Sequence, residues 1–324
     1  MKAVRTRSFL CALLLGAVAL STTGCLSGIK EPYSLEERIP VMEDSLSRTV
    51  RYADGFASDL CVVEDEGSFD ENYVTSEAAA LFDVSDRETL YSKEAFERLY
   101  PASITKVMTA LVAIKNGDLN ARVVVTDDAV ITESGATLCG IEPGDTLTLE
   151  QLLYGLMLPS GNDAGAAIAV HIAGSIDKFA DMMNQEAASL GATGTHFVNP
   201  HGLNDPDHYT TAYDLYLMFH EALSYDTFRT IIGTHDHTAV YMGSDGSQKT
   251  ASWTVGNYYM NGKAETPEGL AVFGGKTGTT KAAGYCLIMG TRTEDGREYA
   301  SVIMGADSRA HLYEDMTNII SKID

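Results

Sequence analysis

The chain has 324 residues, of which 45% are hydrophobic, and this is enough for one large domain or two modest ones. Aromatic and aliphatic residues are spread along the whole length without an internal repeat or a polar low-complexity block, which excludes a disordered chain. The net charge of −22 disfavours a nucleic acid as partner.

The first 24 residues have the layout of a bacterial export signal. Three basic residues come first: Lys2, Arg5 and Arg7. An apolar run over 9–20 and four small residues, 21–24, follow them. The run is too short and wrongly flanked for a stable transmembrane helix, so we predict that residues 1–24 are an export signal. Without them, the mature chain carries a charge near −25.

The sequence that ends at Cys25 resembles a lipobox, where the cysteine is acylated and becomes the first mature residue. Thr22 departs from the leucine that is usual there. The alternative is ordinary cleavage that leaves Cys25 as a free thiol, but exposed free thiols are uncommon in exported proteins. We therefore predict a lipid-anchored or flexible tether over 25–47, and a folded domain over 48–324.

The other cysteines and the histidines give no support for a metal site. The cysteines are Cys61, Cys139 and Cys286. There is no C-x-x-C or H-E-x-x-H spacing, so we expect neither a metal nor another cofactor. An odd number of cysteines allows one disulfide at most. Pairing of Cys61 with Cys139 stays open, and Cys286 is expected to be a small buried hydrophobic residue.

Apolar runs at 61–63 and 78–83 predict strands, and a turn-like 84–87 followed by 89–91 makes the second run part of a hairpin. Pro101 then opens a helical pattern that ends at 116–118. Its apolar residues recur at spacings of three and four: Ile104, Val107, Met108, Leu111 and Ile114.

Ser103 and Lys106 lie at the start of this helix, three residues apart and on the same face, so the ammonium can reach the hydroxyl. A serine hydroxyl is a weak nucleophile unless a base takes its proton. Lysine is such a base when burial and neighbouring positive charge lower its pKa. Backbone N–H groups at the helix start favour the negative charge that develops. S-x-x-K alone is common in unrelated proteins.

The middle portion, 123–225, is predicted to be mainly helical. The expected helices cover 149–158, 163–173, 176–190 and 212–223. Gly191 should end the third, and Thr211 with Asp214 should form an approximate capping box for the fourth.

Ser160-Gly161-Asn162 should form a turn between the first two of these helices. Such a turn can present Ser160 for proton transfer to a leaving amine, and Asn162 for binding a substrate amide. The same residue types are also the commonest in ordinary turns.

After about residue 235 the pattern changes to strands. The apolar run 270–273 leads into Lys276-Thr277-Gly278-Thr279, which we expect at the end of an inner strand. There Lys276 can bind a carboxylate, Thr277 can add a hydroxyl, and Gly278 lets a substrate backbone approach. The alternative is a lysine that protects an edge strand from aggregation.

The C-terminal part predicts a hairpin, with 284–291 and 298–306 around the turn 294–296, and a last helix over 311–323. Together the elements predict an α/β sandwich. Its N- and C-terminal segments share one antiparallel sheet that has helices on both faces, beside a mainly helical subdomain at about 123–225.

The order S-x-x-K, S-x-N, K-T-G is that of class A β-lactamases and penicillin-binding proteins. The segments 101–110, 158–164, 195–203 and 276–287 resemble low-molecular-weight penicillin-binding proteins, the D-alanyl-D-alanine carboxypeptidases. The resemblance covers about 52–324. It implies the fold of these proteins, a substrate that is a peptidoglycan stem peptide ending in D-Ala-D-Ala, and covalent inhibition by β-lactams.

The resemblance also implies a role for each polar side chain of the three motifs. These roles are nucleophile for Ser103, general base for Lys106, proton transfer for Ser160, the substrate amide for Asn162, and the terminal carboxylate for Lys276 with Thr277. The backbone N–H groups of Ser103 and Thr279 would form the oxyanion hole. Lys276 near Lys106 would lower the pKa of both amines.

A class A β-lactamase is one alternative, but it needs a glutamate in an E-x-x-L-N segment. Between Asn162 and His201 the only glutamate is Glu186, which is followed by Ala-Ala-Ser-Leu. A non-catalytic lipoprotein that senses β-lactams or peptidoglycan is another alternative. The balance of carboxypeptidase, endopeptidase and transpeptidase activity stays open.

Many members of the family also carry a β-rich C-terminal domain that ends in an amphipathic anchor. The last residues here, Ser321-Lys-Ile-Asp, do not resemble one, so we expect attachment through Cys25. The expected location is the outer face of the cytoplasmic membrane or the cell wall.

Overall fold

The computed structural model describes residues 73–323. The predicted export signal, Cys25, the tether and the strand expected at 61–63 lie outside these residues. Within the described part, Cys139 and Cys286 are buried and unbridged. No helix there has the length and apolar character needed to cross a membrane.

Five antiparallel strands form the main sheet, and they come from both ends of the described chain. They are β1 (Ala78–Asp83), β2 (Glu88–Lys93), β7 (Leu270–Thr280), β8 (Gly284–Thr293) and β9 (Glu298–Ala306). Their order in space is β2-β1-β9-β8-β7, so β1 pairs with β9 and joins the N-terminal hairpin to the C-terminal strands. The predicted shared sheet is confirmed, and both predicted hairpins are present.

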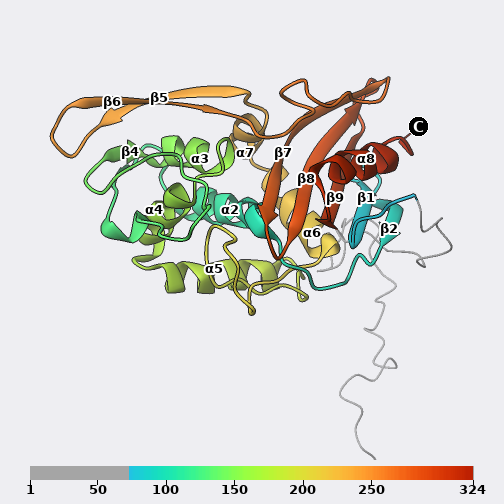
Figure 1. Ribbon diagram of the computed structural model, residues 1–324, viewed down its shortest axis with the longest axis horizontal. Helices are drawn as coiled ribbons and strands as arrows, with labels where there is room; N and C mark the ends of the chain where they lie inside the picture. The colour runs from blue at the N-terminus through green and yellow to red at the C-terminus, as the bar shows by residue number, and fades with distance from the viewer. Residues whose placement is uncertain (1–72, 324) are drawn as a thin grey trace, which may run out of the picture. The chain divides into compact units, whose positions relative to one another are not determined.

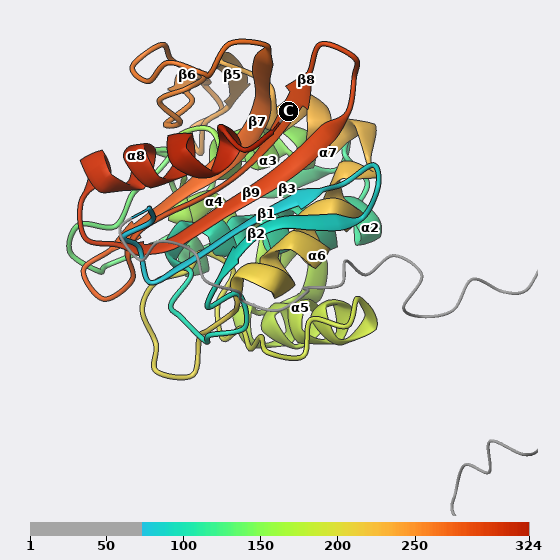
Figure 2. The same cartoon turned by 90° about the vertical axis from the view of Figure 1, so that its right-hand side faces the viewer.

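Apolar residues fill both sides of β1 because both faces of the sheet are covered. Ala80 and Phe82 belong to one hydrophobic core, and Ala79 and Leu81 belong to the other. Alternate side chains of a strand point to opposite faces, so a strand between two cores reads as a continuous apolar run. Helix α8 (Arg309–Ile320) covers one face, and α6 (Ala212–Leu223) lies on the other (Figure 2).

The helical part follows the sequence prediction closely. Its helices are α3 (Leu149–Met157), α4 (Asn162–Ala173), α5 (Ile176–Ser189) and α6. Gly191 takes a φ of 80° just after α5, as expected of a glycine that ends a helix. The Thr211 side chain accepts the Asp214 N–H, but the Asp214 carboxylate accepts from Thr195 instead of closing the capping box.

Two features were not predicted. A short helix, α7 (Asp226–Ile232), packs against β7. A second sheet with the order β3-β4-β5-β6 lies partly within the region expected to be helical (Figure 1). Its strands are β3 (Arg122–Val124), β4 (Thr146–Thr148), β5 (Asp236–Met242) and β6 (Gln248–Thr254). Only the strand character after residue 235 was expected.

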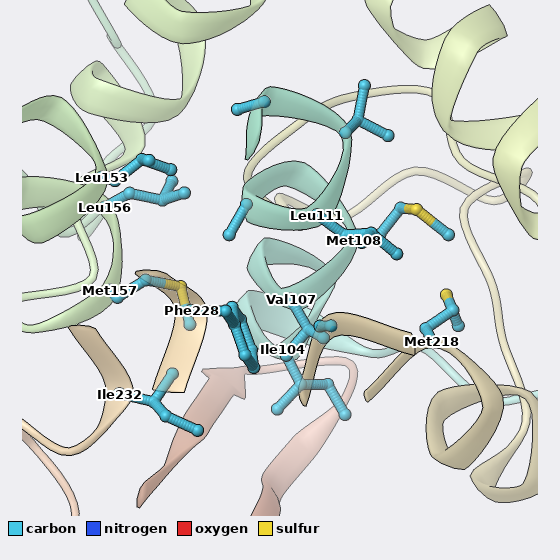
Figure 3. Packing of buried hydrophobic residues seen from close by; sticks show 14 of the residues in the cluster. Ile104, Val107, Met108, Leu111, Leu153, Leu156, Met157, Met218, Phe228 and Ile232 are labelled. Carbon is cyan, nitrogen blue, oxygen red and sulfur yellow. The ribbon is translucent and has the colours of Figure 1, made fainter. Parts of the chain in front are cut away.

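Helix α2 (Lys106–Asn116) runs through the middle of the helical part and is buried on nearly all sides. Leu111 and Met108 pack among side chains of α3, α6 and α7, including Leu153, Met218 and Phe228 (Figure 3). The helix follows directly on a 3-10 turn, η1 (Ala102–Thr105). Lys106, the first residue of α2, is therefore carried into the protein interior.

Candidate active site

Ser103 lies in η1 and Lys106 begins α2, so the predicted pair sits where a tight turn becomes a helix. The Lys106 Nζ and the Ser103 Oγ lie 2.9 Å apart, within hydrogen-bond distance. Lys106 is fully buried, whereas Ser103 is half-buried and opens into a cavity. The spacing of three residues thus produces the expected contact between amine and hydroxyl.

Two further acceptors hold the Lys106 amine in place. Its Nζ lies 2.7 Å from the Asn162 Oδ1 and 2.7 Å from the His201 carbonyl oxygen. A neutral amine has two N–H groups and one lone pair. When these two oxygens accept the N–H groups, the lone pair faces the Ser103 hydroxyl. This is the arrangement that a base needs to take the serine proton.

Burial lowers the pKa of Lys106 well below its usual value, and the nearby charge of Lys276 lowers it further. The negative charge of Asp163 acts in the opposite direction but is the smallest of the three causes. Burial also lowers the pKa of Lys276, to about 7. The predicted lowering of the Lys106 pKa by Lys276 is therefore present, whereas the pKa of Lys276 itself is lowered by burial.

Ser160 lies in the turn between α3 and α4, as predicted, with a φ of 69° that side-chain-bearing residues rarely adopt. Such a conformation costs roughly 1–2 kcal/mol and is typical of functional turns. The turn is packed closely, because a Cβ on Gly161 would lie 2.7 Å from the Cys139 Cβ. The Asp163 carboxylate accepts backbone N–H groups from Cys139 and Gly140 and so fixes the adjoining loop.

Lys276 lies within β7 rather than at its end, and β7 is an edge strand of the five-stranded sheet. The expectation of an inner strand is therefore wrong. Nevertheless, Lys276 is only 2% exposed, because η1 packs against this strand, and it does not serve as an exposed edge lysine. Its Nζ donates to the Thr277 carbonyl oxygen over 2.7 Å.

Gly278 also has a structural role that was not predicted, whereas its predicted role in substrate approach stays a prediction. A Cβ there would lie 2.9 Å from the Pro101 oxygen, 2.9 Å from the Ser103 nitrogen and 3.0 Å from the Ile104 nitrogen. The backbone that approaches Gly278 is thus the protein's own turn η1. The glycine brings the Ser103 backbone N–H beside β7, next to Thr279, where the pair of N–H groups was predicted.

A first cavity of about 210 Å³ joins the three motifs. Its lining includes Ser103, Ser160, Thr277, Gly278 and Thr279. Lys276 is not part of the lining, since it lies beneath the surface.

Arg309, which the sequence analysis missed, is the cation that lines this first cavity. It is exposed in the first turn of α8 and donates to the Tyr258 hydroxyl over 3.0 Å. No pattern in the sequence distinguishes this arginine from other surface arginines.

Two buried histidines, His201 and His208, contact Lys106 and its neighbour Thr105. The His208 Nδ1 accepts the Val198 N–H over 3.2 Å, so its Nε2 carries the proton and donates to the Thr105 Oγ1 at 2.9 Å. Burial lowers the pKa of His208 to about 4 and that of His201 to about 3. Both rings are therefore neutral at neutral pH.

A second cavity of about 320 Å³ also has Ser103 in its lining, together with Asn162 and His201. Within residues 73–323, no group of three or more His, Cys, Asp or Glu side chains could hold a metal ion.

The sequence matches the family described as D-alanyl-D-alanine carboxypeptidase over residues 66–308. It is 32% identical to D-alanyl-D-alanine carboxypeptidase DacF of Bacillus subtilis over 76% of this chain and 61% of that protein. It is 33% identical to a D-alanyl-D-alanine carboxypeptidase of a Streptomyces species over 72% of this chain and 81% of that protein. The chain thus spans less than two thirds of the Bacillus relative's length.

Solved structures give the same result. The structure of a Streptomyces DD-transpeptidase superposes with a TM-score of 0.71 at 30% identity and covers 77% of this chain and 97% of its own. The structure of a D-alanyl-D-alanine carboxypeptidase from Mycobacterium tuberculosis has a TM-score of 0.66 at 28% identity, and the match covers 76% of this chain and 90% of that one.

Proposed function

Because the chain belongs to the D-alanyl-D-alanine carboxypeptidase family, we propose that it is a serine carboxypeptidase that removes the terminal D-alanine from peptidoglycan stem pentapeptides. One observation carries this proposal. The buried Lys106 amine lies 2.9 Å from the Ser103 Oγ, at the rim of a cavity lined by the two other motifs.

In the proposed acylation step, the Ser103 Oγ attacks the carbonyl carbon of the penultimate D-alanine, and its proton passes to Lys106. The backbone N–H groups of Ser103 and Thr279 stabilise the negative oxygen of the tetrahedral intermediate. Ser160, which lines the same cavity, then gives its hydroxyl proton to the leaving amine and is reprotonated by the Lys106 ammonium, which becomes neutral again. The peptide bond breaks, D-alanine leaves, and the rest of the peptide is bound to Ser103 as an ester.

The terminal carboxylate of the substrate needs a positive environment that faces the cavity. Arg309 supplies a guanidinium at the cavity wall, and the hydroxyls of Thr277 and Thr279 line the same wall. Lys276 contributes from beneath, through its charge, because its own Nζ is bound to the Thr277 carbonyl oxygen. We assign carboxylate recognition to this group, in which Arg309 makes the direct contact.

Asn162 is assigned two tasks. Its Oδ1 accepts from Lys106, so it positions the base. Its amide N–H groups are the part of the side chain that remains for a substrate carbonyl.

Hydrolysis of the ester by water completes the reaction, and the same step would be slow for a penicillin adduct. Glu186, the glutamate weighed for a β-lactamase, forms an ion pair with Lys115 at 2.7 Å and lines neither cavity. We therefore expect β-lactams to act as inhibitors, with a long-lived adduct on Ser103.

We also propose that the protein is exported and held at the outer face of the cytoplasmic membrane through a lipid on Cys25. The family's substrate lies in the cell wall, and the sequence over 1–25 supports export and acylation. Growth with a radiolabelled fatty acid would label the wild-type protein, and Cys25→Ala would remain unlabelled. A labelled Cys25→Ala protein would place the lipid elsewhere.

The test of the activity is D-alanine release from a pentapeptide that ends in D-Ala-D-Ala, with Ser103→Ala as control. We expect release by the wild type and none by Ser103→Ala. Penicillin binding without any D-alanine release would favour a sensor instead. Fast and repeated hydrolysis of a chromogenic cephalosporin would favour a β-lactamase.

A further inference from the structure

The second cavity beside Ser103 has a charge pattern that the three motifs do not explain. Its lining contains one acidic and one basic side chain, Glu133 and Lys281, which come from different loops. His201 also lines it but is neutral, because burial lowers its pKa to about 3.

A tight turn fixes the position of Glu133. The Ala136 N–H donates to the Glu133 carbonyl oxygen over 3.1 Å, and Gly135 takes a φ of 82° inside this turn. The next residue, Thr137, accepts the backbone N–H of Asn162 over 2.9 Å. The turn that carries Glu133 is therefore attached to the start of α4, beside the Lys106 site.

Lys281 is held by the sheet. It is the first residue after β7 and lies in the turn to β8, where Thr280 pairs with Gly284. The Ala283 N–H donates to the Thr280 Oγ1 over 3.0 Å and closes this turn. Lys281 therefore follows the strand that carries Thr277 and Thr279, on the far side of Thr279 from Lys276.

Both side chains are exposed and available to a ligand. Within residues 73–323, neither Glu133 nor Lys281 is part of an ion pair. Two unpaired opposite charges in one cavity are complementary to a ligand group that itself carries both charges.

The direction of the substrate identifies which part of it reaches this cavity. In the proposed reaction the terminal carboxylate lies in the first cavity, near Arg309, and the scissile carbonyl lies at Ser103. The peptide that precedes this carbonyl must then leave Ser103 through another opening, and the second cavity also contains Ser103. The third stem residue directly precedes the D-alanine that carries the reacting carbonyl, so the Cα atoms of these two residues are about 4 Å apart.

Resting on the function proposed above, we propose that the second cavity selects the third residue of the stem peptide by a side chain that ends in both an ammonium and a carboxylate. This is the chemistry of a diaminopimelate residue. Glu133 takes the ammonium and Lys281 takes the carboxylate. A lysine at the same place would satisfy Glu133 but leave its ammonium near Lys281.

The experiment compares three tripeptides of the form acyl-X-D-Ala-D-Ala, where X is diaminopimelate, lysine or Nε-acetyl-lysine. The full-length protein is assayed for D-alanine release, as kcat/KM, and for protection of Ser103 from a fluorescent penicillin. The variants are Glu133→Gln and Lys281→Gln. Glu88→Gln and Lys178→Gln are the matched controls, because both residues are exposed and line neither cavity.

We expect the wild type to prefer the diaminopimelate peptide over the acetylated one by roughly three- to tenfold, which is the effect of one or two exposed charge contacts. For each peptide we compare its kcat/KM with that of the Nε-acetyl-lysine peptide. In Glu133→Gln this ratio should be lower than in the wild type for both the diaminopimelate peptide and the lysine peptide. Lys281→Gln should lower this ratio for diaminopimelate but raise it for lysine. The control variants should keep the wild-type ratios.

Equal ratios in the wild type and both variants, or no preference for diaminopimelate in the wild type, would overturn the proposal. If no tripeptide releases D-alanine, the carboxypeptidase function fails. The protection assay still measures the charge preference in that case, because it requires only that the peptide occupies the site.

Discussion

Replacement of Gly278 by alanine tests how closely β7 must approach the turn that carries Ser103. The new Cβ would lie 2.9 Å from the Pro101 oxygen and from the Ser103 nitrogen, about half an ångström short of ordinary contact. Because these are backbone atoms, the strand and the turn must separate. Such overpacking destabilises a fold by roughly 1–3 kcal/mol.

In the proposed reaction, the separation also moves the Ser103 N–H away from the oxygen that it would stabilise. A displacement of 1 Å at a reacting centre costs about a hundredfold in rate, so half of it corresponds to roughly tenfold. We therefore expect Gly278→Ala to acylate with penicillin about ten times more slowly than the wild type, with a lower Tm.

The assay is the second-order rate of Ser103 acylation by a fluorescent penicillin, measured well below the Tm of each variant. Gly256→Ala is the matched control, because Gly256 lines the same cavity and its new Cβ would lie 3.4 Å from the Thr277 Oγ1, an ordinary contact. The control should stay within about twofold of the wild type. A Gly278→Ala variant that acylates as fast as Gly256→Ala would refute the reasoning.

Three further predictions concern charge. Arg309→Gln should lower the kcat/KM for a pentapeptide acid about tenfold relative to its C-terminal amide, since one charge-assisted contact is lost; an unchanged ratio would remove Arg309 from carboxylate recognition. The folded-state pKa of Lys276, about 7, lies below its unfolded value, so wild-type stability should rise from pH 7 to pH 10. Lys276→Met lacks this rise, so the stability of the variant relative to the wild type, measured by urea unfolding, should fall over the same pH range; parallel pH profiles of the two proteins would contradict the lowered pKa of Lys276. The pKa of His208 is likewise depressed, to about 4, so the wild type should lose stability as the pH falls from 6.5 to 4, and His208→Gln should lose roughly 3 kcal/mol less; equal losses would show that His208 titrates normally.

The sequence was sufficient for elements with strong periodicity. The apolar residues of α2 recur every three or four positions because the helix is surrounded by other helices, and Thr211 and Gly191 stand at helix ends for local reasons. The central strands β1 and β9 were visible because both of their faces are buried, which makes them mostly apolar.

The second sheet could not be predicted in the same way. Its strands β3 and β4 have three residues each, which is too short for a period of two to be recognised. β5 and β6 do alternate, with Ala239 and Tyr241 buried between exposed residues, and they pair with each other as a local hairpin. The other partner of β5, however, is β4, which is far away in the sequence. Pairing of this kind is set by tertiary contacts rather than by local pattern.

In the candidate site, the sequence predicted the contact between Ser103 and Lys106 but not all of its surroundings. Ser103 and Lys106 are close because they share one turn, so their contact is local and predictable. The carbonyl oxygen of His201 and the guanidinium of Arg309 reach the site only through the fold. A backbone oxygen that reaches a site cannot be recognised from residue types. The contact between Gly278 and the turn at Ser103 could not be predicted either, because that turn lies 175 residues earlier in the sequence.

The central claim is that Ser103 is the acylated nucleophile, and mass spectrometry of the full-length protein after reaction with penicillin tests it most directly. Intact mass should rise by one penicillin per chain, and peptide mapping should place the adduct on Ser103. Under the same conditions Ser103→Ala should remain unmodified. An adduct on another residue, or an equal adduct on Ser103→Ala, would contradict the account.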